Sequence, residues 1–352
     1  MLYSLTDLGW SSHFMMQLSI EQLESFTPAR IIAVHKNSYD ALSESGALNL
    51  RTNPDSTDTI CVGDWVLADQ DGLIHHRLER LTALSRRGAG ESAHRQMIAA
   101  NVDVLFIVTS CNDDFNLARL ERYLVLARSA GCQPAIVLTK PDLCDDPAQY
   151  ARQAQSLAPE LPVLTVNAHD PAQALRLTDW WGKGQTAALL GSSGVGKSTL
   201  AATLTGQDIV TQGIRDDDAK GRHTTTTRNL YLAHHGGWLL DTPGMRALRL
   251  MDVADGIEAV FADLANLSEQ CHFRDCTHTS EPGCAIQAEI AAGRLDPDRL
   301  RRWQKLVLED LRNRQTLALS RSRDKATVKY QKHAQKPRHV ALANPLGSLA
   351  TA

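Results

Sequence analysis

The sequence GSSGVGKST at Gly191–Thr199, between the apolar runs Ala187–Leu190 and Leu200–Leu204, decides the fold of this chain. It fits the pattern G-x-x-x-x-G-K-[ST], in which glycines let the backbone turn tightly so that its N–H groups and a helix N-terminus surround phosphate oxygens. Lys197 would then reach the β- and γ-phosphates, and Ser198 would bind magnesium. The alternative is a glycine-rich turn without a ligand, but the strand, loop and helix context favours a nucleotide-binding α/β domain.

The composition is that of a globular chain with two or three domains. The 352 residues are 43% hydrophobic and 22% charged. The first thirty residues hold no long apolar run behind a basic start, and no stretch of the chain approaches 18 consecutive apolar residues. We therefore expect a cytoplasmic protein that has no membrane partner.

The N-terminal third has the texture of a small β-barrel. Residues 1–27 carry no recognisable motif, and we expect a poorly ordered lead-in with a short helix at Leu18–Phe26. Within residues 28–86, short β-type runs are separated by Gly, Asn, Pro and Asp clusters. About five strands in so few residues predict an OB-fold, which either contacts RNA or only packs. We expect Arg86–Ala100 to be a linker.

Residues 101–250 alternate buried strands with amphipathic helices, a pattern typical of a parallel sheet with helical crossovers. The strand TAALL at 186–190 leads into the phosphate-binding loop. Gly206–Arg228 has no hydrophobic period, so we expect it to be mobile. The segment 229–244 predicts two further strands that end in Asp241-Thr242-Pro243-Gly244.

A base-reading motif stands at Thr139-Lys140-Pro141-Asp142, at the end of an apolar strand, where open α/β sheets bind ligands. The Asp142 carboxylate can accept hydrogen bonds from both the N1 and N2 donors of guanine, and adenine has no matching pair. Such bonds contribute about 1.5–3 kcal/mol each. Asn167-Ala168 would bring a backbone N–H to guanine O6. The alternative for residues 139–142 is an ordinary turn.

Two more segments complete a GTPase site. In the D-x-x-G match, Asp241 would hold magnesium through water and the Gly244 N–H would face the γ-phosphate. Thr224–Thr227 offers a hydroxyl, for which Thr225 is our candidate, that can close on magnesium when the third phosphate is present. The guanine motif at 139 precedes the phosphate-binding loop at 191, the reverse of the ordinary order. The sheet is therefore expected to be circularly permuted.

This order of motifs, TKPD, GSSGVGKST, GRHTTTT and DTPG, resembles the circularly permuted ribosome small-subunit-dependent GTPases, the RsgA/YjeQ family. The likeness spans about residues 28–310, with a β-barrel before the motifs and a Cys/His cluster after them. It implies hydrolysis of GTP to GDP, stimulated by the small ribosomal subunit late in its maturation, with 16S rRNA as the contact surface. One departure from the general GTPase pattern is Thr139, where Asn is commoner.

The resemblance gives an α/β fold class, a circularly permuted P-loop GTPase domain with an N-terminal OB-fold β-barrel and a C-terminal, mostly helical zinc-binding domain. The expected GTP-binding residues are Thr139, Lys140, Pro141, Asp142, Asn167, Ala168, Gly191, Ser192, Ser193, Gly194, Val195, Gly196, Lys197, Ser198, Thr199, Asp241 and Gly244.

The motifs named above do not include a residue that orients the attacking water. Met245 follows DTPG where Ras-like GTPases carry a water-orienting glutamine, and methionine cannot orient water. His223 is our candidate by location and by resemblance, with Lys197 and Thr225 as the other catalytic residues. The alternative is that His223 is a polar loop residue. We expect slow intrinsic turnover, and activation in trans is worth about 10³–10⁵ in rate.

A metal site is predicted by Cys271, Cys276, His278 and Cys284, which supply three thiolates and one imidazole. This is a closed tetrahedral set for one structural zinc ion, and the alternative is a reduced cysteine-rich loop. His272 is the poorer choice of imidazole. The other four of the seven cysteines are expected to be small buried or half-buried residues: Cys61, Cys111, Cys132 and Cys144.

The C-terminal part is basic. Arg294–Arg338 carries 14 Lys/Arg against 5 Asp/Glu, an excess of 9. An isolated charge run is usually a solvated helix face, but the ribosomal partner that the resemblance implies favours phosphate binding here. We expect residues 251–319 to form the zinc-binding helical domain, with its last helix ending at Leu319. Residues 320–352 form a basic tail, expected to be disordered unless bound.

Two rival functions remain at this point. The phosphate-binding loop also permits an ATP-dependent small-molecule kinase, although Asp142 argues for guanine. Met245 leaves room for a nucleotide-dependent RNA-binding module with negligible turnover. We expect the chain to be monomeric, with GTP or GDP and magnesium as its ligands.

Overall fold

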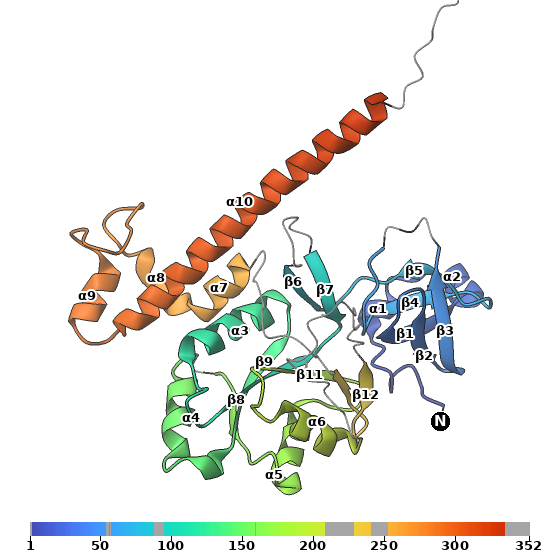
Figure 1. Cartoon of the computed structure of the whole chain (residues 1–352), viewed down its shortest axis with the longest axis horizontal. Helices are drawn as coiled ribbons and strands as arrows, with labels where there is room; N and C mark the ends of the chain where they lie inside the picture. The colour runs from blue at the N-terminus through green and yellow to red at the C-terminus, as the bar shows by residue number, and fades with distance from the viewer. Residues whose placement is uncertain are drawn as a thin grey trace, which may run out of the picture.

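The computed structural model describes residues 2–53, 56, 58–87, 95–158, 160–207, 229–240 and 253–334, and only the backbone beyond residue 315. A β-barrel and a group of C-terminal helices lie on opposite sides of a central sheet (Figure 1). Among these residues, none of the helices combines the length and the apolar character needed to span a bilayer.

The N-terminal strands close into a barrel in the order β1-β2-β3-β5-β4, which confirms the predicted OB-fold. Apolar side chains that alternate along the strands, such as Ala29, Ile31 and Val66, fill its interior. The strands are β1 Thr27–Val34, β2 Tyr39–Ser43, β3 Gly46–Thr52, β4 Trp65–Ala68 and β5 Leu73–Arg77.

The segment before the barrel is folded, so the prediction of a poorly ordered lead-in was wrong. Helix α1 spans Ser12–Met15 and the predicted short helix is α2, Ile20–Ser25. Leu8 and Phe14 are fully buried in the main core. The Trp238 indole N–H donates to the Asp7 carbonyl oxygen at 2.8 Å, which ties this segment to the central sheet. The apolar residues of the segment before the barrel are irregularly spaced, so neither a helical nor a strand periodicity predicts this packing.

The linker expected at Arg86–Ala100 is also corrected. Strands β6, Ala83–Arg87, and β7, Arg95–Ala100, pair as an antiparallel hairpin. Leu84 and Ile98, one on each strand, are buried in the main core. The backbone at Gly63, with φ +89°, packs closely against this hairpin. A Cβ atom there would lie 2.0 Å from the Ala100 carbonyl oxygen, so the position requires glycine. The barrel and the hairpin are therefore in direct contact.

The central sheet has six strands in the order β10-β9-β8-β11-β13-β12. All neighbours are parallel except β12 and β13. Because β8 lies between β9 and β11, the carboxyl ends of the two motif-bearing strands meet at one edge, as the permuted order requires. The strands are β8 Val104–Ser110, β9 Gln133–Thr139, β10 Val163–Thr165, β11 Thr186–Leu190, β12 Leu230–Leu232 and β13 Trp238–Leu240.

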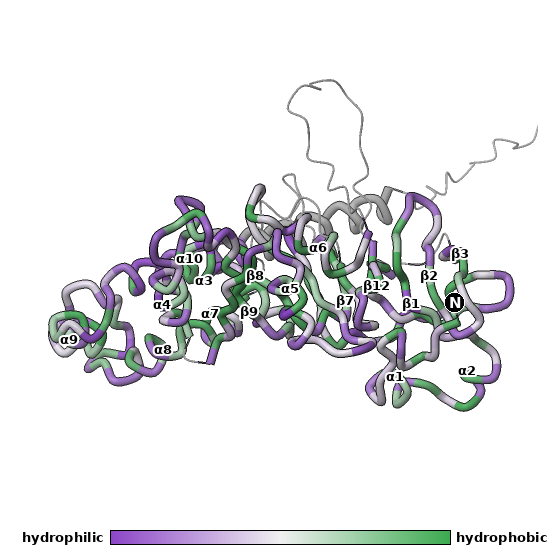
Figure 2. Tube along the Cα trace, turned by 90° about the horizontal axis from the view of Figure 1, so that it is seen from below, coloured by the Kyte–Doolittle hydropathy of each residue, from purple (hydrophilic) through white to green (hydrophobic). Residues whose placement is uncertain are grey.

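Helices cover both faces of this sheet. Leu105, Ile107 and Leu190 face the core that contains helix α3, whereas Phe106 and Leu189 face the core that contains α6. Such near-continuous apolar strands are typical of a sheet buried on both sides, and Figure 2 shows β8 and β9 as hydrophobic segments at the centre of the molecule. The helices are α3 Leu117–Ser129, α4 Pro147–Gln155, α5 Pro171–Leu175, the 3-10 turn Arg176–Trp180, and α6 Lys197–Thr205.

The C-terminal part is helical, as predicted. Its helices are α7 Ala254–Val260, α8 Ala262–Ser268, α9 Ala285–Ala291 and α10 Pro297–Ala334. Helix α10 projects away from the rest of the molecule (Figure 1) and continues to Ala334, well beyond the predicted end at Leu319. The helix thus includes residues 320–334 of the predicted tail, whose disorder in the unbound state stays a prediction, and residues 335–352 lie outside the described residues.

The barrel is joined to the strand that leads into the phosphate-binding loop by the fully buried Arg30. Its guanidinium donates to the Thr186 hydroxyl at 2.5 Å and to the Leu8 carbonyl oxygen at 2.5 Å. Burial lowers the pKa of Arg30 to about 10, so the side chain is still charged at neutral pH. A buried cation whose partner is removed is strongly destabilising, so these acceptors fix the barrel against β11.

Candidate functional site

The phosphate-binding loop lies between β11 and α6, as the sequence predicts. A Cβ atom at Gly191 would lie 2.1 Å from the Val108 carbonyl oxygen, so only glycine allows the loop to leave the sheet here. Gly194 and Gly196 have φ angles of +79° and +92°, which favour glycine. The Lys197 ammonium donates to the Gly191 carbonyl oxygen at 2.9 Å and also to the Ser192 carbonyl oxygen.

Thr139 connects the base-reading motif to this loop. Its buried hydroxyl donates to the Val195 carbonyl oxygen at 2.6 Å, and the Thr109 carbonyl oxygen lies within reach at 3.1 Å. A threonine therefore makes the connection at the position where an asparagine is commoner. Because the bond joins the end of β9 to the loop that follows β11, it fixes the spacing between the two motifs.

The Asn167-Ala168 motif also contacts the phosphate-binding loop. A Cβ atom at Gly196 would lie 3.5 Å from the Ala168 Cβ and 3.8 Å from the Thr139 Cγ2, so these three residues pack together. The Asn167 side chain accepts from the His169 N–H at 2.9 Å, which shapes the turn after β10. The structure thus brings together the parts of the predicted site that lie on β9, β10 and β11.

The base-reading motif turns sharply at its second residue. Lys140 is left-handed, with φ +55°, and the 3-10 turn Pro141–Leu143 follows. This turn leaves Asp142 exposed at the carboxyl edge of the sheet. An exposed carboxylate at this edge is accessible to a ligand, because open α/β folds bind ligands at the carboxyl ends of their strands.

Several predicted site residues lie outside the described residues. They are His223, Thr225, Asp241 and Gly244, together with Met245. Their roles stay predictions. Among the described residues, the sequence reasoning missed Asp114, whose carboxylate accepts a hydrogen bond from the Ser192 hydroxyl at 2.7 Å. The available signal was the polar run Asn112–Asp114, directly after the buried strand β8.

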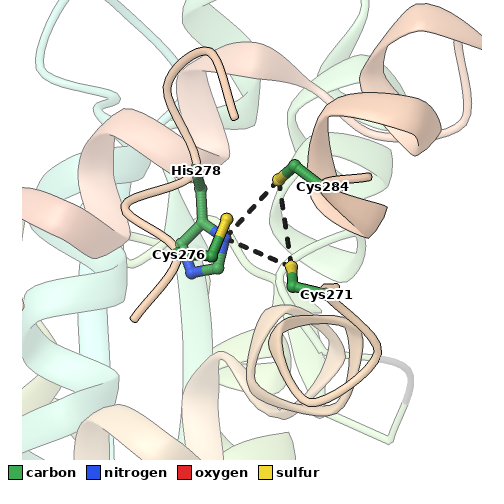
Figure 3. Close-up of side chains that lie close together, drawn as sticks. All are labelled: Cys271, Cys276, His278 and Cys284. Atoms are coloured by element: carbon green, nitrogen blue, oxygen red, sulfur yellow. Dashed lines mark hydrogen bonds between the residues drawn. The ribbon is translucent and has the colours of Figure 1, made fainter. Parts of the chain in front are cut away.

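The predicted metal ligands Cys271, Cys276, His278 and Cys284 come together in the C-terminal part. Their ligand atoms all lie within 4.8 Å of one another. The His278 Nδ1 atom lies 3.6 Å from both the Cys271 and the Cys284 sulfur atoms. The four side chains point toward a common centre (Figure 3), so they form a set that can hold a metal ion.

Surrounding contacts orient these ligands. His278 has φ +60°, and its carbonyl oxygen accepts from the Gln287 side-chain amide at 2.6 Å. The Cys284 sulfur caps helix α9 by accepting from the Gln287 N–H at 3.5 Å. The Trp303 ring of α10 packs against the His278 ring, with centroids 5.7 Å apart. The cluster thus joins the loop after α8 to both α9 and α10.

The remaining cysteines are placed as predicted. Cys61, Cys111 and Cys132 are buried and Cys144 is half-buried. Burial raises the pKa of Cys111 and of Cys132 to about 12, so these thiols stay protonated and are poor metal ligands.

This sequence is similar to those of known proteins. The sequence model of the family described as RsgA GTPase matches residues 77–251. The small ribosomal subunit biogenesis GTPase RsgA of Mesorhizobium japonicum is 51% identical over 316 residues, 88% of this chain and 91% of that protein. The corresponding RsgA 2 protein of Vibrio vulnificus is 46% identical over 334 residues, 95% of each chain.

Solved structures show the same fold. YjeQ from Thermotoga maritima aligns with a TM-score of 0.61 and 23% identity, covering 81% of this chain and 99% of that one. YloQ, described as a circularly permuted GTPase, aligns with a TM-score of 0.58 and 24% identity, covering 81% of this chain and 94% of that one.

The Thr139 hydroxyl is expected to support nucleotide binding. In Thr139→Val, the Val195 carbonyl oxygen loses its donor and the two motifs lose their fixed spacing, so GDP should bind about tenfold more weakly, equivalent to about 1.4 kcal/mol. Thr139→Ser, which keeps the hydroxyl, should retain affinity within about twofold. Titration with a fluorescent GDP analogue measures both.

Thr109→Val is the matched control, because the Thr109 hydroxyl is buried on the neighbouring strand β8 and has no hydrogen-bond partner among the described residues. Its GDP affinity should equal that of the wild type. Equal affinities for Thr139→Val and the wild type would show that the hydroxyl does not support the site.

Proposed function

Since this chain belongs to the RsgA family of GTPases, it is a GTP hydrolase, and we propose that it acts in late maturation of the small ribosomal subunit, which stimulates its turnover. The relatives named as small ribosomal subunit biogenesis GTPases support this partner. The observation that supports the nucleotide-binding part of the proposal is the bond from Thr139 to Val195, which connects the proposed base-reading motif to the phosphate-binding loop.

The residue roles follow from this arrangement and remain part of the proposal. Residues 139–142, with Asn167 and Ala168, bind the guanine base, and Asp142 accepts its N1 and N2 donors. Residues 191–199 surround the phosphates. Lys197 neutralises the β- and γ-phosphates, and Ser198 holds the magnesium ion that accompanies GTP. Magnesium supplies charge stabilisation to the transferring phosphoryl group.

The hydrolytic half of the site is proposed from the sequence. Asp241 would hold magnesium through water, the Gly244 N–H would face the γ-phosphate, and Thr225 would close on magnesium when GTP is bound. Since Met245 offers no group that orients water, His223 is the proposed hydrolytic residue. A site whose catalytic group must be put in place by a partner is expected to turn over slowly by itself.

Zinc is the metal that we propose for the Cys/His cluster. A tetrahedral zinc ion with bonds of about 2.3 Å to sulfur and 2.0 Å to nitrogen has S–N edges of about 3.5 Å and S–S edges of about 3.8 Å. In the structure, His278 Nδ1 lies 3.6 Å from the sulfur atoms of Cys271 and Cys284, and these two sulfur atoms are 3.9 Å apart. The Cys276 sulfur lies within 4.8 Å of the other three ligand atoms. All four positions come from the protein, so the role is structural.

The RNA contact is proposed for the C-terminal part. One face of α10 carries Arg301, Lys305 and Arg312, and the Arg301 side chain is 70% exposed. With the excess of 9 basic residues in 294–338, this face suits the phosphates of 16S rRNA. We propose that the protein works as a cytoplasmic monomer.

The domain boundaries of this proposal follow the predicted scheme with the corrections above. The OB-fold spans 28–86, the GTPase domain 101–250 and the zinc-binding helical domain 251–319, whose last helix continues to Ala334. The contacts of Leu8 and Phe14 with the core support adding the N-terminal segment to the barrel side of the molecule.

Small subunits are expected to raise GTP turnover strongly. Purified protein alone should hydrolyse GTP slowly, and saturating 30S subunits should raise the rate by about 10³-fold or more, because activation in trans supplies the missing positioned group. Phosphate release during a titration with 30S subunits measures this effect.

Large 50S subunits serve as the control, and they should leave the rate near its intrinsic value. An equal rate with and without 30S subunits would overturn the proposed stimulation. No turnover under any condition would favour a binding module instead of an enzyme.

Zinc content tests the metal assignment. The wild type should hold one zinc ion per chain, and Cys276→Ser should lose it, because tight structural binding of about 10–16 kcal/mol depends on the full ligand set. Cys144→Ser, which removes a thiol outside the cluster, should keep the metal. Metal analysis after dialysis against a mild chelator decides the matter. One zinc ion retained in Cys276→Ser, or none in the wild type, would contradict the assignment.

A further inference from the structure

The phosphate-binding loop has a second support, in addition to Thr139, at its second residue. The Ser192 hydroxyl donates to the Asp114 Oδ2 atom at 2.7 Å, across 78 residues of sequence. A hydrogen bond to an ionised carboxylate is about twice as strong as one between neutral groups. The Ser192 carbonyl oxygen also accepts from Lys197. Ser192 is therefore held both at its side chain and at its backbone.

Asp114 is itself fixed by the turn that follows β8. Its N–H donates to the Asn112 Oδ1 atom at 3.0 Å, and the Ser110 hydroxyl donates to the same atom at 2.7 Å. Strand β8 pairs directly with β11, with Ile107 opposite Leu190. The turn carrying Asp114 and the loop carrying Ser192 thus begin from neighbouring strands, which leaves little freedom between them.

An arginine neutralises the carboxylate. The Arg119 Nη2 atom lies 2.9 Å from the Asp114 Oδ2 atom, and the same group donates to the Asp114 carbonyl oxygen. The Asp114 side chain is only 28% exposed, so an unpaired charge there would repel phosphates at short range. The ion pair with Arg119 offsets this repulsion, so a carboxylate can lie next to a phosphate-binding loop.

The helix that carries Arg119 is anchored on its other side. Asn116 caps α3 by accepting from the Arg119 N–H at 2.9 Å. The fully buried Glu121 accepts from Arg299 at 3.2 Å and from Arg302 at 2.6 Å, both on α10. Asp114 is therefore paired with a residue of α3, a helix that is itself fixed to the C-terminal part of the molecule.

We propose that Asp114 is a positioning residue for the phosphate-binding loop. It holds Ser192 so that the loop's N–H groups stand ready for phosphate oxygens before the nucleotide arrives. A pre-organised set of donors avoids reorganisation on binding and in the transition state. The inference rests on the proposed function in that the loop binds the phosphates of GTP, and it adds a residue outside the motifs to that site.

A double-mutant cycle in GDP affinity tests the proposal without ribosomal subunits. Asp114→Ala and Ser192→Ala should each weaken GDP binding about five- to tenfold, because each removes the same charge-assisted bond. The double variant should be no weaker than the weaker single variant, since the two residues act as one unit. Asp114→Asn, which keeps an acceptor, should fall between the wild type and Asp114→Ala.

Asp113→Ala is the matched control, because it removes an exposed carboxylate next to Asp114 and should leave GDP affinity unchanged. Additive losses in the double variant, or unchanged affinity in either single variant, would overturn the proposal. Melting temperatures within a few degrees of the wild type separate positioning from a general loss of stability. If the wild type binds GDP but 30S subunits do not stimulate hydrolysis, the proposed function fails while this cycle still decides the role of Asp114.

Discussion

The hydrogen bond from the Thr139 hydroxyl to the Val195 carbonyl oxygen, 2.6 Å long, is the constraint on which the nucleotide site depends. The base-reading motif and the phosphate-binding loop follow β9 and β11, which have β8 between them, so their spacing is set by the sheet and by this bond. Permutation changes the order in which the chain supplies these strands but not the edge at which they meet. A site that is split in sequence is thereby a single site in space.

Buried charges hold the three parts of the molecule together. Arg30 joins the barrel to β11, which leads into the phosphate-binding loop, and Glu121 joins α3 to α10 through Arg299 and Arg302. Burial raises the pKa of Glu121, and its two arginine partners oppose that shift. Breaking such a buried pair is costly, so the barrel and the C-terminal helices are held firmly against the domain that binds the nucleotide. This suits the proposed division of roles, in which RNA binds to the C-terminal part and GTP to the central domain.

Local patterns in the sequence predicted the elements that carry chemistry. Strand β11 is the predicted TAALL run, and the metal ligands come together because their close spacing brings them to one loop region. Contacts between residues far apart in the sequence were not predicted. The hairpin of β6 and β7 pairs Leu84 with Ala99 across a polar run that resembles a linker, and Leu8 is buried without any periodic pattern around it. The bond from Ser192 to Asp114 joins residues 78 positions apart, and no local sequence pattern indicates that they are in contact.

Selection between guanine and adenine tests the account most directly, because it requires the base-reading motif and the phosphate-binding loop to act on one ligand. Calorimetric titration with GDP and with ADP makes the comparison. The two charge-assisted bonds proposed for Asp142 predict that GDP binds at least about 100-fold more tightly than ADP, a difference of about 2.7 kcal/mol. Equal affinities for GDP and ADP would contradict the account and favour an enzyme that uses ATP.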